Sequence, residues 1–295
     1  MRIANTVIAG ASRCGTTALY EWLAAHPEVT VSTPKETRYF MDSNCPLLNP
    51  SANFHSHKLS KYPSFFAGPG AQSAKIVLEA TPDYLYQQTA LAEIPTLTPQ
   101  VKVLILLRNP AHRALSLYRF ARDNQRVISN DVTFERFVTE STKQSAFFDS
   151  RPILKAGIEN GKYVKYLKAW KNALPPERLL ILASEQLWLN PATQMAAISD
   201  FLNIDASIWN SDSFPRSNAS VRRRFPHLRS ALRRSSRFIP TPMKATPLIQ
   251  AWRKLTSGRK SPTSTMEARV VTELKSYYAP SIVQLEELLG VTLPW

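Results

Sequence analysis

The stretch Gly10-Ala11-Ser12-Arg13-Cys14-Gly15-Thr16-Thr17 lies between an apolar run at 3–9 and a helical pattern at 18–25. A strand, a glycine-bounded loop and a helix start bring backbone N–H groups and the positive end of a helix dipole to one place. The spacing is that of the Walker A loop, G-x-x-x-x-G-K-[ST], except that Thr16 stands at the lysine position. Arg13 supplies a positive charge from the other side of the loop. The sequence therefore predicts a phosphate-binding loop without the lysine of nucleoside triphosphatases.

Strand and helix patterns alternate along the rest of the chain. Apolar runs predict strands at 3–9, 28–31, 75–79, 101–107 and 178–183, and helical patterns predict helices at 16–26, 110–124, 163–174, 191–202, 266–278 and 281–289. This alternation is typical of a mostly parallel sheet with helices on both faces, whose ligands bind at the carboxyl ends of the strands. We expect an α/β protein with a P-loop-like three-layer fold, built as a single domain over residues 1–295.

The chain is strongly basic. Its 295 residues include 37 Lys and Arg against 22 Asp and Glu, which gives a net charge of +15. Such a field attracts nucleotides, acidic polysaccharide, nucleic acid or a membrane surface, or it serves solubility alone. Many of the arginines lie in a proline- and serine-rich stretch at 211–260, which we interpret as a basic flap within the domain.

Cysteine content and hydropathy indicate in which cellular compartment the protein is expected. Cys14 and Cys45 are too few for a disulfide framework or a metal cluster, and free thiols suit a reducing compartment. The apolar run after Met1 continues directly into the glycine loop and leaves no cleavage region for a signal peptide. No apolar stretch approaches the roughly 18 residues of a transmembrane helix. These features predict a cytoplasmic protein.

A second phosphate site is predicted at Arg108. The apolar strand at 101–107 ends in this arginine, where a nucleoside triphosphatase would carry the aspartate that holds Mg²⁺. Together with the missing loop lysine, this favours phosphate recognition by protein cations, with no metal required. The planar guanidinium of Arg108 suits a phosphate, and the hydroxyl of Ser116 can add a contact. Considered alone, Arg108 is equally a solvated arginine at a helix start.

Ordered sequence motifs carry a resemblance to a known family. Two segments hold the phosphate motifs, IAGASRCGTTALYEWLAAHPEV and VLILLRNPAHRALSLYRF, and between them stand PKETRYF and LEATPDYLY. In this order they resemble sulfotransferases that use 3′-phosphoadenosine 5′-phosphosulfate (PAPS). PKETRYF and LEATPDYLY are similar to the P-K-E-x-x-F and E-K-T/S-P-x-Y segments of the heparan-sulfate branch. A later helix–strand–helix and the C-terminal YYAPSIVQLEELLGVTLPW extend the resemblance over nearly the whole chain.

The resemblance implies how the nucleotide donor is held. The loop would bind its 5′-phosphosulfate, and the second motif and the basic flap would bind its 3′-phosphate and adenosine. The implied contacts of the loop are Arg13, Cys14, Gly15, Thr16 and Thr17, those of the second motif are Arg108 and Ser116, and those of the flap are Arg222 and Arg224. Arg13 falls where many members carry a lysine, so its implied role is electrostatic, at the bridging oxygen of the leaving phosphate.

The resemblance also implies the catalytic groups. Glu36 matches the carboxylate that takes the proton of the acceptor, which is chemistry that a positioned carboxylate can perform. Lys35 would face the sulfonate or tune Glu36. The alternative for Glu36 is a surface carboxylate paired with Lys35 or Arg38. One departure stands out, because the lysine of the E-K-T segment is Ala80 here.

Two neighbours of that departure have structural interpretations. We expect Glu79 to be a strand-end residue with a structural hydrogen bond. The following Thr81-Pro82-Asp83 has the composition of a turn.

These observations predict a sulfotransferase that moves the sulfonate from PAPS to an acceptor hydroxyl and releases adenosine 3′,5′-bisphosphate. We expect a carbohydrate acceptor; a small hydroxylated metabolite, a lipid or an amine is the alternative. From other functional classes, a basic nucleic-acid-binding protein and a nucleotide kinase remain. A nucleic-acid-binding function explains the charge but not the paired phosphate motifs. In addition, no nucleic-acid-reading fold is recognisable in the sequence.

Overall fold

The computed structural model describes residues 2–68, 72–209, 214 and 262–295 of the chain. The strands of this part form one parallel sheet in the order β2-β3-β1-β4-β5. They are β1 (Thr6–Gly10), β2 (Val29–Val31), β3 (Ile76–Ala80), β4 (Lys102–Leu107) and β5 (Leu179–Ala183). The predicted α/β class with a central parallel sheet is confirmed.

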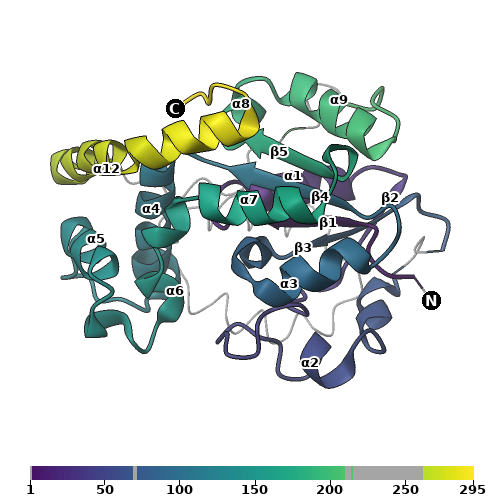
Figure 1. Ribbon diagram of the computed structural model, residues 1–295, viewed down its shortest axis with the longest axis horizontal. Helices are drawn as coiled ribbons and strands as arrows, with labels where there is room; N and C mark the ends of the chain where they lie inside the picture. Colours follow the sequence, from purple (N-terminus) through teal and green to yellow (C-terminus); the bar gives the residue numbers. More distant parts are fainter. Residues whose placement is uncertain (1, 69–71, 210–213, 215–261) are drawn as a thin grey trace, which may run out of the picture.

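Helices cover both faces of the sheet (Figure 1). The α-helices are α1 (Thr16–Ala24), α2 (Phe54–His57), α3 (Gln88–Glu93), α4 (Pro110–Arg119), α5 (Phe134–Thr142), α6 (Pro152–Lys155), α7 (Val164–Ala173), α8 (Ser184–Leu189), α9 (Pro191–Leu202) and α12 (Thr265–Leu289). Shorter 3₁₀ segments are η1 (Tyr62–Phe66), η2 (Pro82–Tyr86), η3 (Ile94–Thr96), η5 (Ala146–Phe148), η6 (Glu159–Gly161) and η7 (Pro176–Arg178). Helices α3 and α7 lie on one face, and α1 lies on the other beside α8, where Trp22 packs edge-on against Trp188.

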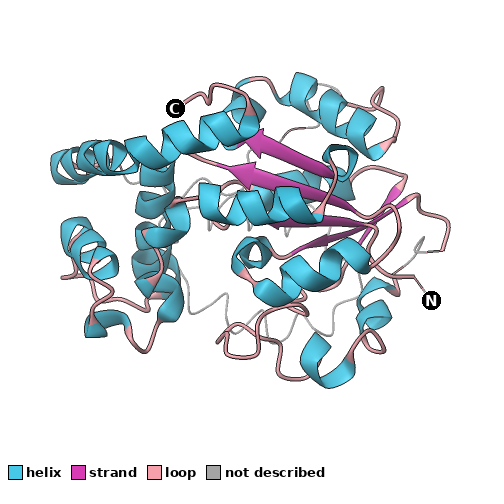
Figure 2. Ribbon diagram, in the orientation of Figure 1, coloured by secondary structure: helices cyan, strands magenta, loops and turns pink. Residues whose placement is uncertain are grey.

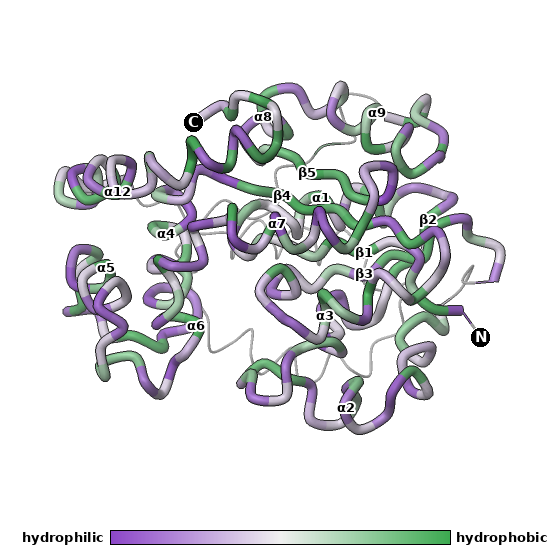
Figure 3. Tube along the Cα trace, viewed as in Figure 1, coloured by the Kyte–Doolittle hydropathy of each residue, from purple (hydrophilic) through white to green (hydrophobic). Residues whose placement is uncertain are grey.

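The sheet is the hydrophobic centre of the molecule. In β4, every residue from Val103 to Leu107 is fully buried, and β1 is buried along its whole length. Strands that are covered by helices on both faces have continuous apolar sequences. The strands in the middle of Figure 3 are accordingly green, the colour of hydrophobic residues. The strands all run parallel, and the arrowheads of β4 and β5 point toward the side where α4 lies (Figure 1 and Figure 2), so the residues that follow the strands gather at one edge.

The C-terminal helix differs from the prediction. Two helices were expected at 266–278 and 281–289, but α12 runs unbroken through Pro280. A proline in a helix removes one backbone donor; here both halves are held by packing, through buried Leu274 before it and Leu285 after it. The helix starts in a capping box at Ser264 and stops at Gly290 in the left-handed conformation. No described helix is long and apolar enough to cross a membrane.

The helix predicted at 110–124 also changes geometry along its length. It is α-helical to Arg119 and then continues as a π-helical segment, η4 (Phe120–Gln125). A π-helical turn re-aims the side chains around it. Here it starts at Phe120, whose ring lies 4.2 Å from the guanidinium carbon of Arg13 in the glycine loop.

A buried carboxylate organises the end of β3. Glu79 is fully buried, and four hydroxyl groups donate hydrogen bonds to it. Thr37 donates at 2.5 Å, Tyr84 at 2.8 Å and Thr81 at 3.0 Å, and Tyr62 donates to the second carboxylate oxygen. Burial raises the pKa of Glu79, and the four donors oppose this shift. Glu79 therefore has the expected structural role, but it acts through four hydrogen bonds rather than a single one.

The protons of this cluster can be assigned by counting donors. The backbone N–H of Tyr39 donates to the hydroxyls of Tyr84 and Thr37, and the N–H of Phe40 donates to Tyr84. Because these hydroxyls accept from the backbone, their own hydrogens point to Glu79. With hydroxyl groups on both oxygens, hydrogen bonding favours the ionised form of Glu79, against the burial that raises its pKa. The cluster thereby ties the backbone at 37–40 to the end of β3.

Replacing Glu79 by glutamine is expected to lower the free energy of unfolding by about 2 kcal/mol, because one hydroxyl loses a charged acceptor and faces an amide donor. Urea denaturation measures the change. Glu177→Gln, at an exposed site in η7, is the matched control and should stay within about 0.5 kcal/mol of the parent. Equal unfolding midpoints for the two variants would contradict this account.

Candidate active site

The segments that follow the strands bring polar side chains to one edge of the sheet. The loop 11–15 follows β1, Lys35 and Glu36 lie after β2, Asp83 lies after β3, Arg108 directly follows β4, and Ser184 directly follows β5. In a parallel sheet this carboxyl edge is where ligands bind. The two phosphate motifs and the acceptor-side motif predicted from the sequence are thus brought together.

The glycine loop presents free backbone donors at the start of α1. Gly15 is the N-cap residue in the left-handed conformation, with φ 93°, and it carries no side chain that could cap the helix. A Cβ atom there would also lie 3.3 Å from Oγ of Ser184. The first N–H groups of a helix have no intrahelical acceptor. Those of Thr16 and Thr17 therefore suit an anion.

Arg13 connects the two phosphate motifs. Its Nε donates a hydrogen bond of 3.3 Å to Oγ of Ser116 on α4. Burial and, after it, the positive charge of Arg108 lower the pKa of Arg13 to about 10. Two guanidinium groups held near each other in a partly buried site repel, and an anion between them relieves the repulsion.

The turn that carries Arg108 is fixed from three sides. The side chain of Asn109 caps α4 by accepting from two backbone N–H groups of its first turn, at 3.0 and 3.2 Å. Tyr163 donates to the carbonyl of Arg108 at 2.9 Å, and Glu185 accepts from the N–H of Asn109 at 3.0 Å. The backbone at Arg108 is therefore held in place, while its side chain stays half-buried at the edge.

A further cation lies beneath the loop and was missed by sequence reasoning. Arg113 is 1% exposed, donates to the carbonyl of Gly157 at 2.6 Å, and has no Nε partner among the described residues. In the sequence Arg113 has the pattern of any helical arginine, because no local signal shows that its face of the helix is buried. Its charge acts on the neighbouring Cys14, but burial dominates and raises the pKa of that thiol to about 11. Cys14 is thus a neutral, fully buried filler of the loop.

Glu36 lies on the acceptor side between two cations. Lys35 Nζ lies 3.5 Å from one carboxylate oxygen, and Arg38 Nη2 lies 3.2 Å from the other. Lys35 also donates to Oγ1 of Thr17 in α1 at 3.2 Å, which connects Glu36 to the phosphate loop. Burial lowers the pKa of Lys35, and Glu36 opposes this. The ion pairs of Glu36 with Lys35 and Arg38, which were the alternative interpretation of this residue, are both present. They belong to the site, because Lys35 also contacts the phosphate loop.

Asp83 is a second carboxyl group at this edge that was interpreted only as part of a turn. Burial and then the negative charge of Glu36 raise the pKa of Asp83 to about 6, and Arg38 and the Ser12 hydroxyl of the glycine loop oppose this shift. Its place shortly after the buried strand β3 is the signal that could have identified it. The remaining predicted contacts, Arg222 and Arg224, lie outside the described residues, as does the basic flap apart from Phe214.

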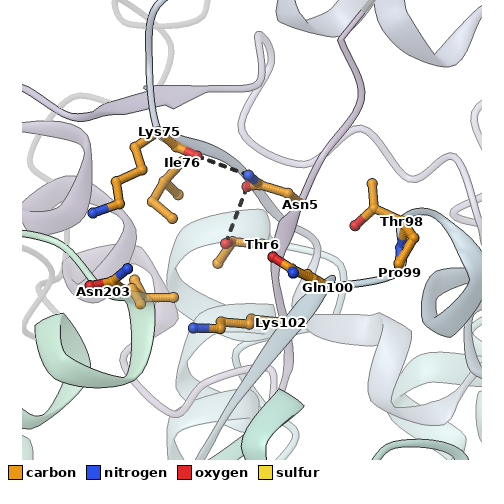
Figure 4. A pocket seen from close by; sticks show the side chains of 10 residues that line it. Asn5, Thr6, Lys75, Ile76, Thr98, Pro99, Gln100, Lys102 and Asn203 are labelled. Atoms are coloured by element: carbon orange, nitrogen blue, oxygen red, sulfur yellow. Dashed lines mark hydrogen bonds between the residues drawn. The ribbon is translucent and has the colours of Figure 1, made fainter.

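A separate cavity of about 450 Å³ lies at the opposite, amino edge of the sheet (Figure 4). It is lined by the first residues of three strands, Thr6, Ile76 and Lys102, and the side chains of Lys75 and Lys102 reach into it. Lys102 donates to the carbonyl of Phe201. Of the predicted phosphate and acceptor contacts that the structure describes, none lines this cavity.

Comparison with known proteins identifies the family. The model of the sulfotransferase domain matches residues 4–237. The chain is 29% identical over 208 residues to the bifunctional heparan sulfate N-deacetylase/N-sulfotransferase 2 of Mus musculus, covering 69% of this chain and 22% of that relative. It is 27% identical over 207 residues to the human enzyme 1 of the same name, covering 70% and 23%. The matched region is thus less than a quarter of these relatives.

A solved structure shares the fold over almost the full length. The sulfotransferase from Alicyclobacillus acidocaldarius superposes with a TM-score of 0.66 at 18% identity, covering 99% of this chain and 98% of that one. The family model spans far more than half of the chain. The family and the fold class predicted from the motifs are therefore confirmed, and the chain belongs to the sulfotransferase domain family.

Proposed function

We propose that the protein transfers the sulfonate group of PAPS to an acceptor hydroxyl on a carbohydrate and releases adenosine 3′,5′-bisphosphate. The observation that carries this proposal is the contact between Arg13 and Ser116. It joins a loop suited to one phosphate to a helix suited to another, with Arg108 beside them. A donor with phosphate groups at both its 5′ and 3′ positions matches two such sites.

The residues on the donor side fit this nucleotide. The N–H groups and hydroxyls of Thr16 and Thr17 would hold the 5′-phosphosulfate at the start of α1, where the helix dipole favours negative charge. Arg108 and Ser116 would hold the 3′-phosphate through charge-assisted hydrogen bonds. Burial and then the positive charge of Arg108 lower the pKa of Arg13, and an anion bound beside the two guanidinium groups would offset their repulsion, which supports the fit.

On the acceptor side, Glu36 would take the proton of the attacking hydroxyl. The acceptor oxygen forms a bond to sulfur, the bond from sulfur to the bridging oxygen breaks, and its electron pair remains on the departing phosphate. Arg13 and Lys35 are the cations placed to stabilise that charge, and Lys35 already contacts both Thr17 and Glu36. This division of roles requires only protein cations and no metal.

Two observations support a carbohydrate acceptor. The relatives are named for heparan sulfate, an acidic polysaccharide, and the net charge of +15 favours a polyanionic substrate. Because the same relatives are N-sulfotransferases, an amine of such a chain is the second candidate acceptor. Transfer from radiolabelled PAPS to a panel of polysaccharides with free hydroxyls or free amines, glycolipids and small alcohols separates these acceptors.

Binding of adenosine 3′,5′-bisphosphate tests the donor site without any acceptor. At about 100 times its dissociation constant a ligand stabilises by about 2.7 kcal/mol, which raises the melting temperature by about 5 °C. Arg108→Ala should abolish most of this rise, whereas Arg136→Ala, at an exposed site in α5, should preserve it. A larger rise with ATP-Mg²⁺ would favour a nucleotide kinase, and a larger rise with an oligonucleotide would favour a nucleic-acid-binding protein.

Glu36→Gln tests the proton acceptor. Loss of a general base is expected to lower kcat about 100-fold or more, while the thermal shift with adenosine 3′,5′-bisphosphate stays near that of the parent. Glu135→Gln, at an exposed site in α5, is the control and should retain full turnover. Unchanged turnover in Glu36→Gln would remove this residue from its proposed role.

A further inference from the structure

The cavity at the amino edge of the sheet has a lining that suits a charged, hydrophilic ligand (Figure 4). Its volume of about 450 Å³ lies in the range of small-molecule binding sites. Seven of the ten described residues that line it are polar or charged, and two of these are lysines. The same ten residues include no carboxylate, histidine, cysteine or aromatic ring. A cavity lined in this way favours an anion with further polar groups.

The two lysines come from strands on either side of β1. Both β3 and β4 pair with β1, and Lys75 directly precedes β3 while Lys102 is the first residue of β4. Two strand spacings, about 10 Å, therefore separate their backbones, and both side chains reach into the cavity (Figure 4). Burial and, after it, the positive charge of Lys75 lower the pKa of Lys102. An anion between the two ammonium groups would offset this repulsion.

Both ammonium groups keep hydrogen-bond donors for a ligand. Lys102 donates to the carbonyl of Phe201 at the end of α9, and an ammonium group has three donors. Nζ of Lys75 lies 3.8 Å from the nearest carboxylate oxygen of Glu28. That distance is too long for a hydrogen bond, and an ion pair between two partly exposed side chains is weak.

The amides of the cavity divide into one that is engaged and two that are free. The side chain of Asn5 donates to the carbonyl of Lys75 at 2.9 Å and accepts from the N–H of Val77 at 2.8 Å, so it fastens β3 to β1. The exposed side-chain amides of Gln100 and Asn203 have no hydrogen-bond partner among the described residues. An amide offers both donors and an acceptor, which matches the hydroxyls of a sugar ring.

We propose that this cavity is a subsite for a negatively charged sugar unit of the acceptor chain, held at the edge of the sheet opposite the transferred sulfonate. Lys75 and Lys102 would pair with the carboxylate or sulfate of that unit. The amides of Gln100 and Asn203 would bind its hydroxyls. A nucleotide fits less well, because no aromatic ring among the lining residues offers its base a stacking surface. This choice of ligand rests on the proposed function.

A subsite at this edge would act on long acceptors only. β1 has five residues and spans about 17 Å, so the cavity and the reacting edge are on the order of 20 Å apart. A chain of several sugar units can cover this span, whereas a disaccharide cannot. A chain that is held at two sites binds more tightly than at either one alone. The subsite should therefore lower the KM of long chains.

Binding to the cavity can be measured without PAPS. We would titrate the isotope-labelled protein with glucuronic acid and follow the backbone amide resonances of Gln100 and Asn203. Glucose, a similar ring without the carboxylate, should bind about tenfold more weakly or less, which is the worth of one hydrogen bond to a charged group. This comparison uses the parent and does not depend on the folding of any variant.

Lys75→Gln tests the lysine contact at a side chain that is partly exposed. We expect the dissociation constant for glucuronic acid and the KM for a heparan sulfate chain each to rise about tenfold. The KM for a disaccharide acceptor should stay within about twofold of the parent value. Lys168→Gln, at an exposed site in α7, removes the same charge and is the matched control for all three measurements.

Two binding results would overturn the proposal. Glucose that binds as tightly as glucuronic acid would remove the role of the lysines. Inorganic sulfate that binds as tightly as glucuronic acid would indicate a simple anion site and exclude the sugar.

Activity separates the subsite from the proposed function. An active parent whose KM for long chains is the same in Lys75→Gln and Lys168→Gln overturns the subsite, while the proposed function stands. A parent that binds glucuronic acid in the cavity but transfers no sulfonate contradicts the proposed function and supports the binding site.

Discussion

Four hydroxyl donors converge on the buried carboxylate of Glu79, and the acceptor side of the site depends on this convergence. The donors come from three segments that are separate in the sequence: Thr37 lies after β2, Tyr62 lies in η1, and Thr81 and Tyr84 follow β3. A single carboxyl group thus holds them in one arrangement. A buried ionised carboxylate is tolerated only when its hydrogen bonds are satisfied. Because Thr37 is one of the donors, the position of Glu36 is set by a group that does not contact it. The reactive edge is therefore supported from within the sheet.

The donor side is organised differently, by cations that have few anionic partners. Arg13, Arg108 and Arg113 lie close enough for their charges to affect one another or the loop. Arg113 pairs with no carboxylate within the described residues. Such an arrangement is unfavourable for the protein alone and favourable once an anion binds. The cations are therefore preorganised for anion binding. The two halves of the site meet where Lys35 contacts both Thr17 and Glu36.

The parts that sequence reasoning predicted are local ones. The strand–loop–helix around Gly15, the strand end at Arg108 and the parallel sheet follow from short-range patterns and from the rule that strand ends meet at one edge. The Glu79 cluster depends on partners up to 42 residues away in the sequence, and the burial of Arg113 depends on tertiary packing, so neither has a local signal. Pro280 shows the converse, because packing on both sides overrides the tendency of proline to end a helix.

Asp83 shows why the acceptor side was harder to predict. A threonine, a proline and an aspartate in a row have the composition of a turn, and a short 3₁₀ segment does begin there. What gives Asp83 a chemical environment is the neighbouring loop, through Ser12, and the segment that carries Glu36. The family and the fold are confirmed, while the roles of Glu36, Arg13 and Lys35 stay predictions.

The buried thiol of Cys14 has a practical consequence. It is fully buried beneath the glycine loop, and its sulfur lies 3.7 Å from the hydroxyl of Tyr163. A neutral thiol in this position cannot react with an alkylating reagent until the loop opens, whereas Cys45 is only partly buried. The rate at which Cys14 is alkylated thus measures the local opening of the phosphate loop. Alkylation of Cys14 would therefore report on the local stability of the binding site without any ligand or label.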